Sequence, residues 1–436
     1  MAPESGRAGR RRIAVVGSGM AGLTAAHVLQ HADSVSLYEA DGRLGGHAHT
    51  HDVASADGPL QQVDSGPIVH NERADPLLLR LFRDLDVRTQ ECDTSMSVRC
   101  EGCGLEYAGA FRLRSVFAQP RNALRSRFVR MLTEIPRFHR EVRRVLDAEP
   151  PQDAAVEACR QAITLGQFLA GCRFSSYFVS HFMTPLVAAV WSCSPEAALE
   201  YPAQYLFRFL DHQGWLSAGG APTWRTVNGG AREYVERIAK ELDAVHTSTP
   251  VRAVRRFADA AEIVTEDGTT HRYDAVVLAA HPDQTLQMLA DPTRAEREVL
   301  GSFCYSRNPA LLHTDARLLP RAPAAQASWN YLMASCETSA HGVCISYHMN
   351  RLQRLESPED YLVTLGGHDR VDGDRVLARM VYERPLYTPE SVAAQQRLPE
   401  LNSAVTAYAG AYHGWGLHED GCRSGVNAAA ALGARW

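Results

Sequence analysis

The 436-residue sequence predicts an α/β fold with a parallel-sheet domain and a second, α+β domain. Three observations predict it. A short apolar run at residues 13–16 breaks into a glycine-rich turn and continues as an Ala/Leu-rich helical segment to about His31, as in a strand–turn–helix unit. Apolar residues recur at helical spacing in residues 120–147 and 164–191. Strand-like runs then recur between residues 303 and 400, which indicates a second sheet.

The glycine-rich turn is the strongest motif of the chain. Gly17 allows the tight strand-to-helix turn, Gly19 lets the backbone approach a pyrophosphate, and Gly22 lets helix and strand pack closely. The helix then begins at Met20 and Ala21, where free N–H groups and the positive end of the helix dipole face the phosphates.

An acidic residue follows at the distance that this motif requires. The second apolar run, residues 34–38, ends on Glu39, twenty residues after Gly19, where a carboxylate can accept both ribose hydroxyls of an adenosine. The strand, turn, helix and acid together predict a Rossmann-like dinucleotide site rather than a structural glycine turn. An arginine and a glycine pair extend the pattern past the acid, in Ala40, Arg43, Gly45, Gly46 and His47.

This extended motif resembles FAD-binding proteins of the amine oxidase, protoporphyrinogen oxidase and phytoene desaturase superfamily. By that resemblance Arg43 borders the FAD, and the backbone of Gly45 and Gly46 lies against its ribityl and flavin end. A D-x-G-P turn resembles the segment that passes beside the flavin, although Gly-Pro also marks plain β-turns. Its residues are Gly66, Pro67 and Ile68.

Two later blocks resemble the same superfamily. A glycine pair, helix, strand, hairpin and apolar strand follow one another between residues 224 and 282, which implies that the backbone of Val251 meets the adenine and that Ala280 lies at the cofactor. Near the end of the chain, a glycine-rich turn, an acid and a helix imply N–H groups at the flavin and pyrophosphate. The residues concerned are Gly410, Gly416, Glu419, Asp420 and Ser424. The spacing is off by about one residue from the amine oxidase pattern, so Glu419 and Asp420 are not distinguished by role.

The resemblance therefore implies an amine-oxidase-like two-domain flavoprotein with interleaved domains. Residues 1–90, 224–300 and 403–436 are expected to form the FAD-binding domain. Residues 91–223, mainly helical, and the sheet of residues 301–402 are expected to form the substrate domain.

Charge and composition exclude some functions. A net charge of −5 gives no reason to expect nucleic acid binding. The basic start of the chain lacks an apolar segment, and no run of about eighteen apolar residues occurs, so we expect a cytoplasmic protein without a spanning helix. Residues 120–147 form an arginine-rich amphipathic pattern that Pro136 interrupts. Peripheral contact with the inner face of the membrane and packing against its own domain are both open.

Two motifs could bind metal, but no metal is expected. His47, His49 and His51 would share one face of a strand, yet no acidic or cysteine partner is evident. His47 is interpreted as lying near the isoalloxazine, and a covalent link to the flavin is conceivable there. Cys100 and Cys103 form the only C-x-x-C, and since a zinc site usually needs a second pair, we interpret a tight hairpin with incidental thiols.

A narrower resemblance concerns the substrate. The remainder of the chain is similar to bacterial flavoproteins often encoded beside cyclopropane-fatty-acid-synthase-like methyltransferases, which implies a hydrophobic, acyl-lipid substrate and a methyltransferase as pathway partner. The segments that carry it are VDSGPIVHNERADP, LEYAGAFRL, AAVWSCSP, WRTVNGGAREY, SWNYL, YHMNRLQ and AYHGWGLHEDGCRSG.

The expected reaction is hydride transfer from a substrate carbon to flavin N5. His47, His413 and His418 are the candidate acid or base groups because histidine titrates near neutral pH. The candidate pocket walls are Trp191, Tyr412 and Trp415.

Two other reactions are open, a double-bond isomerisation and an amine oxidation. Amine oxidases of this superfamily commonly place a lysine on a substrate-domain strand. Here the only lysine is Lys240, on a predicted helix of the nucleotide domain. Its position makes amine oxidation a less favoured interpretation.

Overall fold

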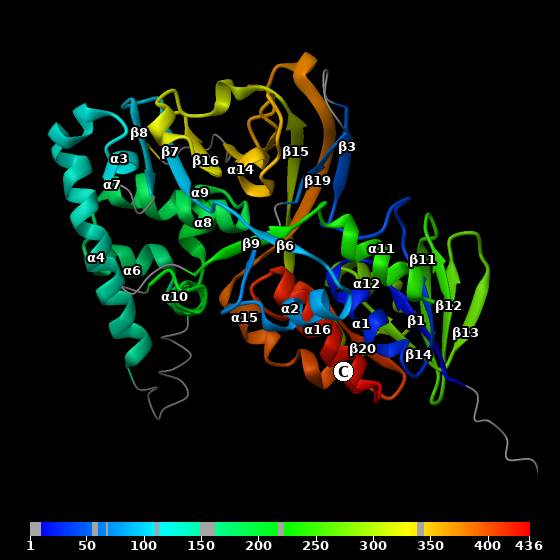
Figure 1. Cartoon of the computed structure of the whole chain (residues 1–436). Coiled ribbons are helices and arrows are strands. Elements are labelled where there is room, and N and C mark those ends of the chain that lie inside the picture. The colour runs from blue at the N-terminus through cyan, green and yellow to red at the C-terminus, as the bar shows by residue number, and fades with distance from the viewer. Residues whose placement is uncertain are drawn as a thin grey trace, which may run out of the picture.

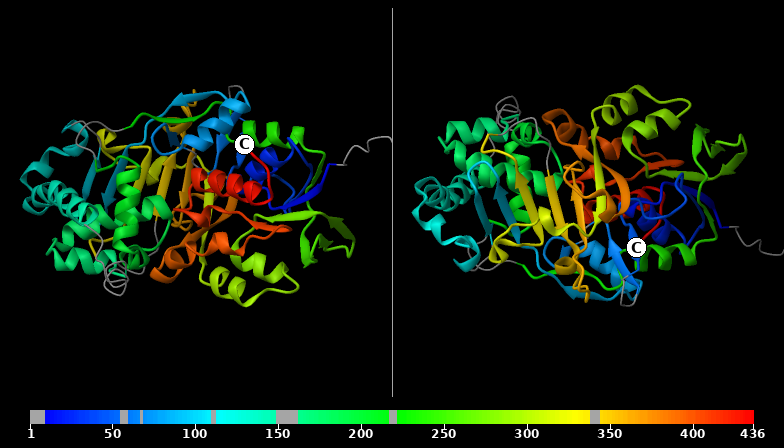
Figure 2. Two further views of the ribbon diagram at one scale, coloured as in Figure 1. Left: turned by 90° about the horizontal axis from the view of Figure 1, so that it is seen from below. Right: turned by 90° about the horizontal axis from the view of Figure 1, so that it is seen from above.

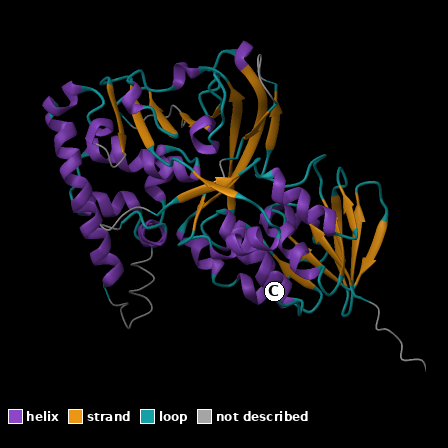
Figure 3. Ribbon diagram, in the orientation of Figure 1, coloured by secondary structure: helices purple, strands orange, loops and turns teal. Residues whose placement is uncertain are grey.

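The computed structural model describes residues 10–54, 60–66, 69–109, 113–148, 162–216, 222–337 and 344–436. It has two bodies, one built on a parallel sheet and the other on a larger mixed sheet with helices beside it (Figure 1, Figure 3). The predicted α/β two-domain fold is confirmed.

The parallel sheet carries the glycine-rich turn. It has the strand order β10-β2-β1-β14-β20, and all its strand pairs are parallel. Its strands are β1 (Arg12–Val16), β2 (Ser34–Tyr38), β10 (Ala244–His246), β14 (Ala275–Leu278) and β20 (Thr406–Tyr408). Distant parts of the chain therefore interleave to form one sheet. Two helices pack together beside it, α1 (Met20–Leu29) and α16 (His418–Ala431).

The described residues also form three small sheets. The first is the antiparallel β11 (Val251–Arg256), β12 (Ala261–Thr265) and β13 (Thr270–Tyr273). The others are β3 (Thr50–Val53) with β4 (Gln61–Asp64), and β5 (His70–Asn71) with β9 (Trp224–Val227) and β6 (Thr89–Glu91). The helices α2 (Pro76–Asp84), α11 (Arg232–Glu241), α12 (Pro282–Met288), α13 (Arg294–Leu300) and α15 (Pro389–Gln395) complete this part.

The second body contains a seven-stranded sheet with the order β19-β15-β18-β17-β16-β7-β8. Its strands are β7 (Met96–Cys100), β8 (Leu105–Gly109), β15 (Cys304–His313), β16 (Trp329–Met333), β17 (Cys344–His348), β18 (Leu362–Leu365) and β19 (Val376–Leu386). Figure 2 shows its yellow strands beside the green helices. One hydrophobic core joins sheet and helices, because Val98, Ile345 and Val363 are buried together with Phe138, Phe178 and Phe207.

The helices of the second body are short apart from α4. They are α3 (Leu113–Val116), α4 (Ser126–Asp147), α6 (Leu165–Gly171), α7 (Ser176–Phe178), α8 (Thr184–Trp191), α9 (Pro195–Glu200), α10 (Ala203–His212) and α14 (Met349–Gln353). A π-helical turn, η2 (Val179–Met183), joins α7 to α8. The 3-10 turns of the structure are η1 (Pro120–Leu124), η3 (Ala316–Leu318), η4 (Pro323–Ala325), η5 (Gly373–Arg375), η6 (Leu398–Leu401) and η7 (Ala411–His413).

The arginine-rich helix α4 packs against its own domain. It continues through Pro136, so the predicted interruption is wrong: the buried residues Met131 and Phe138 on either side hold both halves against α7 and α10. The buried apolar residues of the helix therefore face its own domain. None of the helices in the described ranges is long and apolar enough to cross a bilayer.

Candidate active site

A cavity of about 790 Å³ lies where the strands β1 and β14 end. Ligands of open parallel sheets bind at these carboxyl ends of the strands. Sixteen residues that the sequence analysis placed at the cofactor, the catalytic site or the pocket line this cavity. They are Gly17, Gly19, Met20, Ala21, Glu39, Ala40, Arg43, Gly45, Gly46, His47, Val251, Ala280, Gly410, Tyr412, Gly416 and His418.

The three glycines of the turn have three different environments. Gly17 has a φ of +100°, which a side chain would strain. A Cβ on Gly22 would lie 1.9 Å from the Gly17 carbonyl oxygen, so Gly22 allows the helix to touch the turn. A Cβ on Gly19 would meet nothing within 4 Å, so this backbone faces open space. The first turn of α1 also has no side-chain cap, and its N–H groups are available to a phosphate.

The carboxylate of Glu39 is held at the end of β2. It accepts hydrogen bonds from the backbone N–H of Ser18 at 2.9 Å and of Asp41 at 3.0 Å, and from the Ser18 hydroxyl. The backbone N–H of Thr249 donates to the Glu39 carbonyl at 2.8 Å, which brings the start of β11 beside it. Glu39 and Val251 therefore line the cavity near each other, and their contacts with ribose and adenine stay predictions.

Histidine, tyrosine and arginine side chains line the part of the cavity that lies beside β19. The His47 ring lies edge to face with Tyr382, with centroids 5.2 Å apart. The buried Nε of Arg384 has no hydrogen-bond partner among the described residues. Burial, and next the positive charge of Arg384, lower the pKa of His47 well below its usual range and that of His418 to about 4. Both imidazoles are therefore neutral at neutral pH.

Three predicted cofactor residues near the end of the chain support the cavity without lining it. Glu419 accepts from the backbone N–H of Leu78 at 2.9 Å and so caps α2. Asp420 accepts from the N–H of Leu417 at 3.1 Å at the start of its own helix. The Ser424 hydroxyl accepts from the N–H of Gly410 at 2.9 Å. The structure thus separates the roles of Glu419 and Asp420, which spacing alone left open.

The D-x-G-P turn is only partly described. A Cβ on Gly66 would lie 2.3 Å from the carbonyl oxygen of His47, so this glycine allows a close backbone contact behind the cavity wall. Pro67 and Ile68 lie outside the described residues.

Two of the three predicted pocket walls do not line the cavity. The Trp191 indole is buried and donates to the Trp415 carbonyl oxygen at 2.9 Å, while the Trp415 ring packs on His212. Both tryptophans thus support the turn that carries Gly416. His413 also lies off the cavity lining. Its buried Nε2 has no hydrogen-bond partner within the described part of the chain, and burial lowers its pKa to about 4. Tyr412 alone of the predicted walls reaches the cavity.

The histidine motif does not form one strand face. His51 lies on β3, and its ring is 3.9 Å from that of His49, whereas His47 precedes the strand and contacts Tyr382. His51 Nε2 is 2.8 Å from the Ser65 hydroxyl oxygen. The chain bends before β3 begins, and this bend separates His47 from the other two.

Sequence analysis missed the contribution of β19, which supplies Tyr382, Glu383 and Arg384 to the cavity. The local signal for this strand is weak, because Val381 and Tyr382 favour a strand whereas residues 377–380 favour a helix. It also missed His281, whose ring stacks on Tyr305 with centroids 4.0 Å apart.

Comparison with models of known protein families gives a match. A model of the flavin containing amine oxidoreductase family matches residues 20–433. The chain belongs to this family. It is a FAD-dependent oxidoreductase, and the predicted superfamily is confirmed. A comparison with curated protein sequences finds no match.

Solved structures of similar fold include enzymes with different substrates. Cyclohexylamine oxidase from Brevibacterium oxydans is 16% identical, with a TM-score of 0.68 and coverage of 97% of this chain and 98% of that chain. Putrescine oxidase bound to putrescine is 14% identical, with a TM-score of 0.66 and coverage of 96% and 98%. A CLA-producing fatty acid isomerase from P. acnes is 15% identical, with a TM-score of 0.67 and coverage of 95% and 97%. These likenesses show the fold.

The residues of the cavity fit FAD. Gly19 and the uncapped start of α1 suit the pyrophosphate, and Glu39 suits the adenosine ribose. The remaining length of the cavity, from Gly46 to Gly416 and His418, is available to the flavin.

We predict that two substitutions in the glycine turn affect different properties, one the stability of the apoprotein and the other FAD binding. Gly22→Ala should lower the free energy of unfolding of the apoprotein by about 1–3 kcal/mol, because the added methyl overlaps the Gly17 carbonyl. Gly19→Ala should leave that energy within about 0.5 kcal/mol but weaken FAD binding about tenfold or more, because its methyl faces the cavity. Denaturation of the apoprotein and FAD titration measure the two effects. Equal losses of stability would contradict this assignment.

Proposed function

We propose that this oxidoreductase removes hydride from a carbon of a hydrophobic, fatty-acyl or lipid-like substrate. The observation that carries the proposal is the unpaired Nε of Arg384, a buried cationic donor beside the cavity that His47 and His418 line. When bound, FAD supplies flavin N5 as the hydride acceptor.

Arg384 is suited to bind the carboxylate of an acyl chain. A buried donor without a partner costs free energy, which a charged acceptor would recover. The positive charge of Arg384 is also the largest cause after burial of the lowered pKa values of His47 and His418, so it is felt at this end of the cavity.

Apolar side chains line the same cavity and suit a hydrocarbon chain. They are Val381, Pro385 and Leu417, together with the rings of Tyr305 and Tyr412. A cation set beside such walls fits an amphipathic anion better than it fits a protonated amine, which Arg384 would repel.

The position of the only lysine also favours an acyl substrate over an amine. Lys240 lies on α11 with its side chain 74% exposed, in an ion pair with Glu236. As the only lysine of the chain, it leaves the cavity without the lysine that amine oxidases of the superfamily commonly use.

The neutral histidines provide a place for the substrate proton. Loss of hydride from one carbon to form a double bond requires loss of a proton from its neighbour. His47 and His418 line the cavity and are uncharged at neutral pH, so each can accept a proton there. His413, which lies off the cavity lining, is less suited to this role.

The first test is the visible spectrum of the FAD-loaded protein under anaerobic conditions. We expect the flavin band to bleach on addition of a long-chain fatty acid and to bleach less with its methyl ester, which lacks the charge that Arg384 would bind. An unbleached flavin with a displaced double bond in the recovered fatty acid would instead establish isomerisation. Bleaching by a primary amine alone would establish amine oxidation.

We predict that Arg384→Gln weakens fatty acid binding about 10- to 100-fold, since hydrogen bonds to charged groups contribute about 1.5–3 kcal/mol. Arg307→Gln is the matched control, because Arg307 lines the same cavity but its side chain is 76% exposed. The control substitution should weaken fatty acid binding less than about threefold. Both variants should retain FAD. Equal effects of the two substitutions would contradict a carboxylate role for Arg384.

We predict that the rate of flavin reduction at saturating substrate is flat between about pH 6 and pH 8. The pKa of His418 is lowered to about 4 and that of His47 is lowered well below the usual range, so both become protonated only in acid. The rate should therefore fall as the pH drops through about 4 in a stopped-flow pH jump. His47→Asn and His418→Asn, measured separately, identify the base as the one whose loss removes this decline. A decline centred near pH 6.5 would contradict the neutral assignment.

A further inference from the structure

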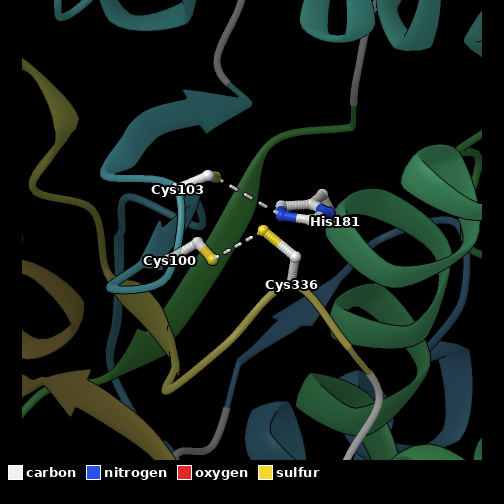
Figure 4. A group of neighbouring side chains, drawn as sticks. All are labelled: Cys100, Cys103, His181 and Cys336. Atoms are coloured by element: carbon white, nitrogen blue, oxygen red, sulfur yellow. Dashed lines mark hydrogen bonds between the residues drawn. The ribbon is translucent and has the colours of Figure 1, made fainter.

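Four potential metal ligands meet away from the flavin cavity. Cys100 and Cys103 lie at the turn between β7 and β8, His181 lies on η2, and Cys336 follows β16 (Figure 4). One ligand atom from each residue lies within 4.8 Å of all the others. The side chains of Cys100 and His181 are buried, and those of Cys103 and Cys336 are partly exposed. The four residues thus converge from three segments that are far apart in the sequence.

The distances suit a tetrahedral ion. The Sγ atoms of Cys100 and Cys336 are 3.8 Å apart, and Cys103 Sγ lies 3.7 Å from His181 Nε2. Tetrahedral zinc, with Zn–S of about 2.3 Å and Zn–N of about 2.0–2.1 Å, separates two sulfurs by about 3.8 Å and a sulfur and a nitrogen by about 3.6 Å. The observed separations therefore need little change to bind zinc.

The turn between Cys100 and Cys103 is shaped to approach the loop of Cys336. A Cβ on Gly102 would lie 3.0 Å from the Ser335 Cα and 3.1 Å from the Cys336 nitrogen, so this position accepts a side chain only if the loops separate. The N–H of Glu101 donates to the Met333 carbonyl at 2.8 Å and ties the turn to β16. The two cysteine-bearing segments are thus fastened together by backbone contacts.

His181 is oriented with its Nε2 toward the sulfurs. Its Nδ1 lies 2.7 Å from the Ser180 hydroxyl oxygen, and the Tyr177 ring stacks on it with centroids 3.9 Å apart. If Nδ1–H donates to Ser180, the lone pair of Nε2 faces Cys103. Such a partner on the second ring nitrogen is typical of metal-binding histidines.

The surroundings compensate the charge of three thiolates. Zinc with three thiolates and a neutral imidazole has a net charge of −1. Arg121 and Arg125 both reach this turn, where their guanidinium groups donate to the Gly104 carbonyl at 3.1 and 3.5 Å. Basic side chains therefore lie beside a group that would be anionic.

We propose that Cys100, Cys103, His181 and Cys336 form a structural zinc site. All four ligands come from the protein, which is typical of structural rather than catalytic zinc. The ion would join the β7–β8 hairpin and the end of β16 to η2, and so fasten the seven-stranded sheet to its helical layer. The hairpin of the sequence interpretation is confirmed, and this proposal replaces the view that its thiols are incidental.

The test measures metal in protein purified under reducing conditions, by elemental mass spectrometry. We expect about one zinc per chain in the wild type and in Cys304→Ser, the control, whose cysteine is exposed and outside the cluster. Cys336→Ser should lose at least about nine tenths of this zinc. The bound FAD of each variant, read from the flavin spectrum, reports whether the rest of the protein has folded.

If Cys336→Ser fails to fold, zinc binding by two His181 variants and cobalt binding by the wild type still test the proposal. His181→Cys should retain zinc because it restores four ligands, whereas His181→Ala should lose it. Wild-type apoprotein titrated with Co²⁺ should show the absorption of tetrahedral cobalt with thiolate ligands. Absence of zinc from the wild type together with no such absorption would overturn the proposal, and so would a Cys100–Cys336 disulfide found by mass spectrometry of the native protein.

Discussion

The contact between the turn at Gly17 and the helix position at Gly22 determines where the cofactor cavity can form. The carbonyl of Gly17 occupies the space of a side chain at Gly22, so α1 begins directly against the end of β1. The other side of α1 is packed as closely, because a Cβ on Gly425 would lie 2.4 Å from the Ala21 carbonyl oxygen. Backbone contacts thus position α1 on two sides. They leave its N–H groups at the cavity, where they are suited to bind a phosphate.

The seven-stranded sheet contributes side chains to the cavity through β19. Tyr382 and Arg384 are two residues apart on β19, so they share one face of the strand, toward the cavity. Glu383 lies between them and also lines the cavity, and its carboxylate lies 3.2 Å from His281 Nδ1 and 3.3 Å from Arg307 Nε. One strand therefore carries both the cation of the cavity and the anion that holds its rim. The parallel-sheet domain thus supplies the glycine turn, His47 and His418 to the cavity, while the second domain supplies Tyr382 and Arg384.

The parts of the structure that were predictable are those determined by local sequence. The strand–turn–helix at Gly17 and the acid at Glu39 depend on near neighbours, and their positions were predicted correctly. Local spacing did not separate Glu419 from Asp420, because the role of Glu419 depends on α2, whose position is set by packing. Trp191 and Trp415 have aromatic side chains, which suit the wall of a pocket. Whether such a ring faces a cavity or a core depends on the tertiary structure. The cysteine cluster was hidden for the same reason, since 236 positions separate Cys100 from Cys336.

The interleaving of the parallel sheet also constrains how the chain is made. The central strand β1 pairs with β14, whose residues follow about 260 positions later, and β14 in turn pairs with β20 near residue 407. Contacts so distant in sequence form slowly, because long loops must close first. During translation, β1 and α1 can pack with β2 early, but α1 meets α16 only when almost the whole chain has left the ribosome. The glycine turn that faces the cofactor cavity is therefore encoded at the start of the chain, yet its helix is fully packed only at the end of synthesis.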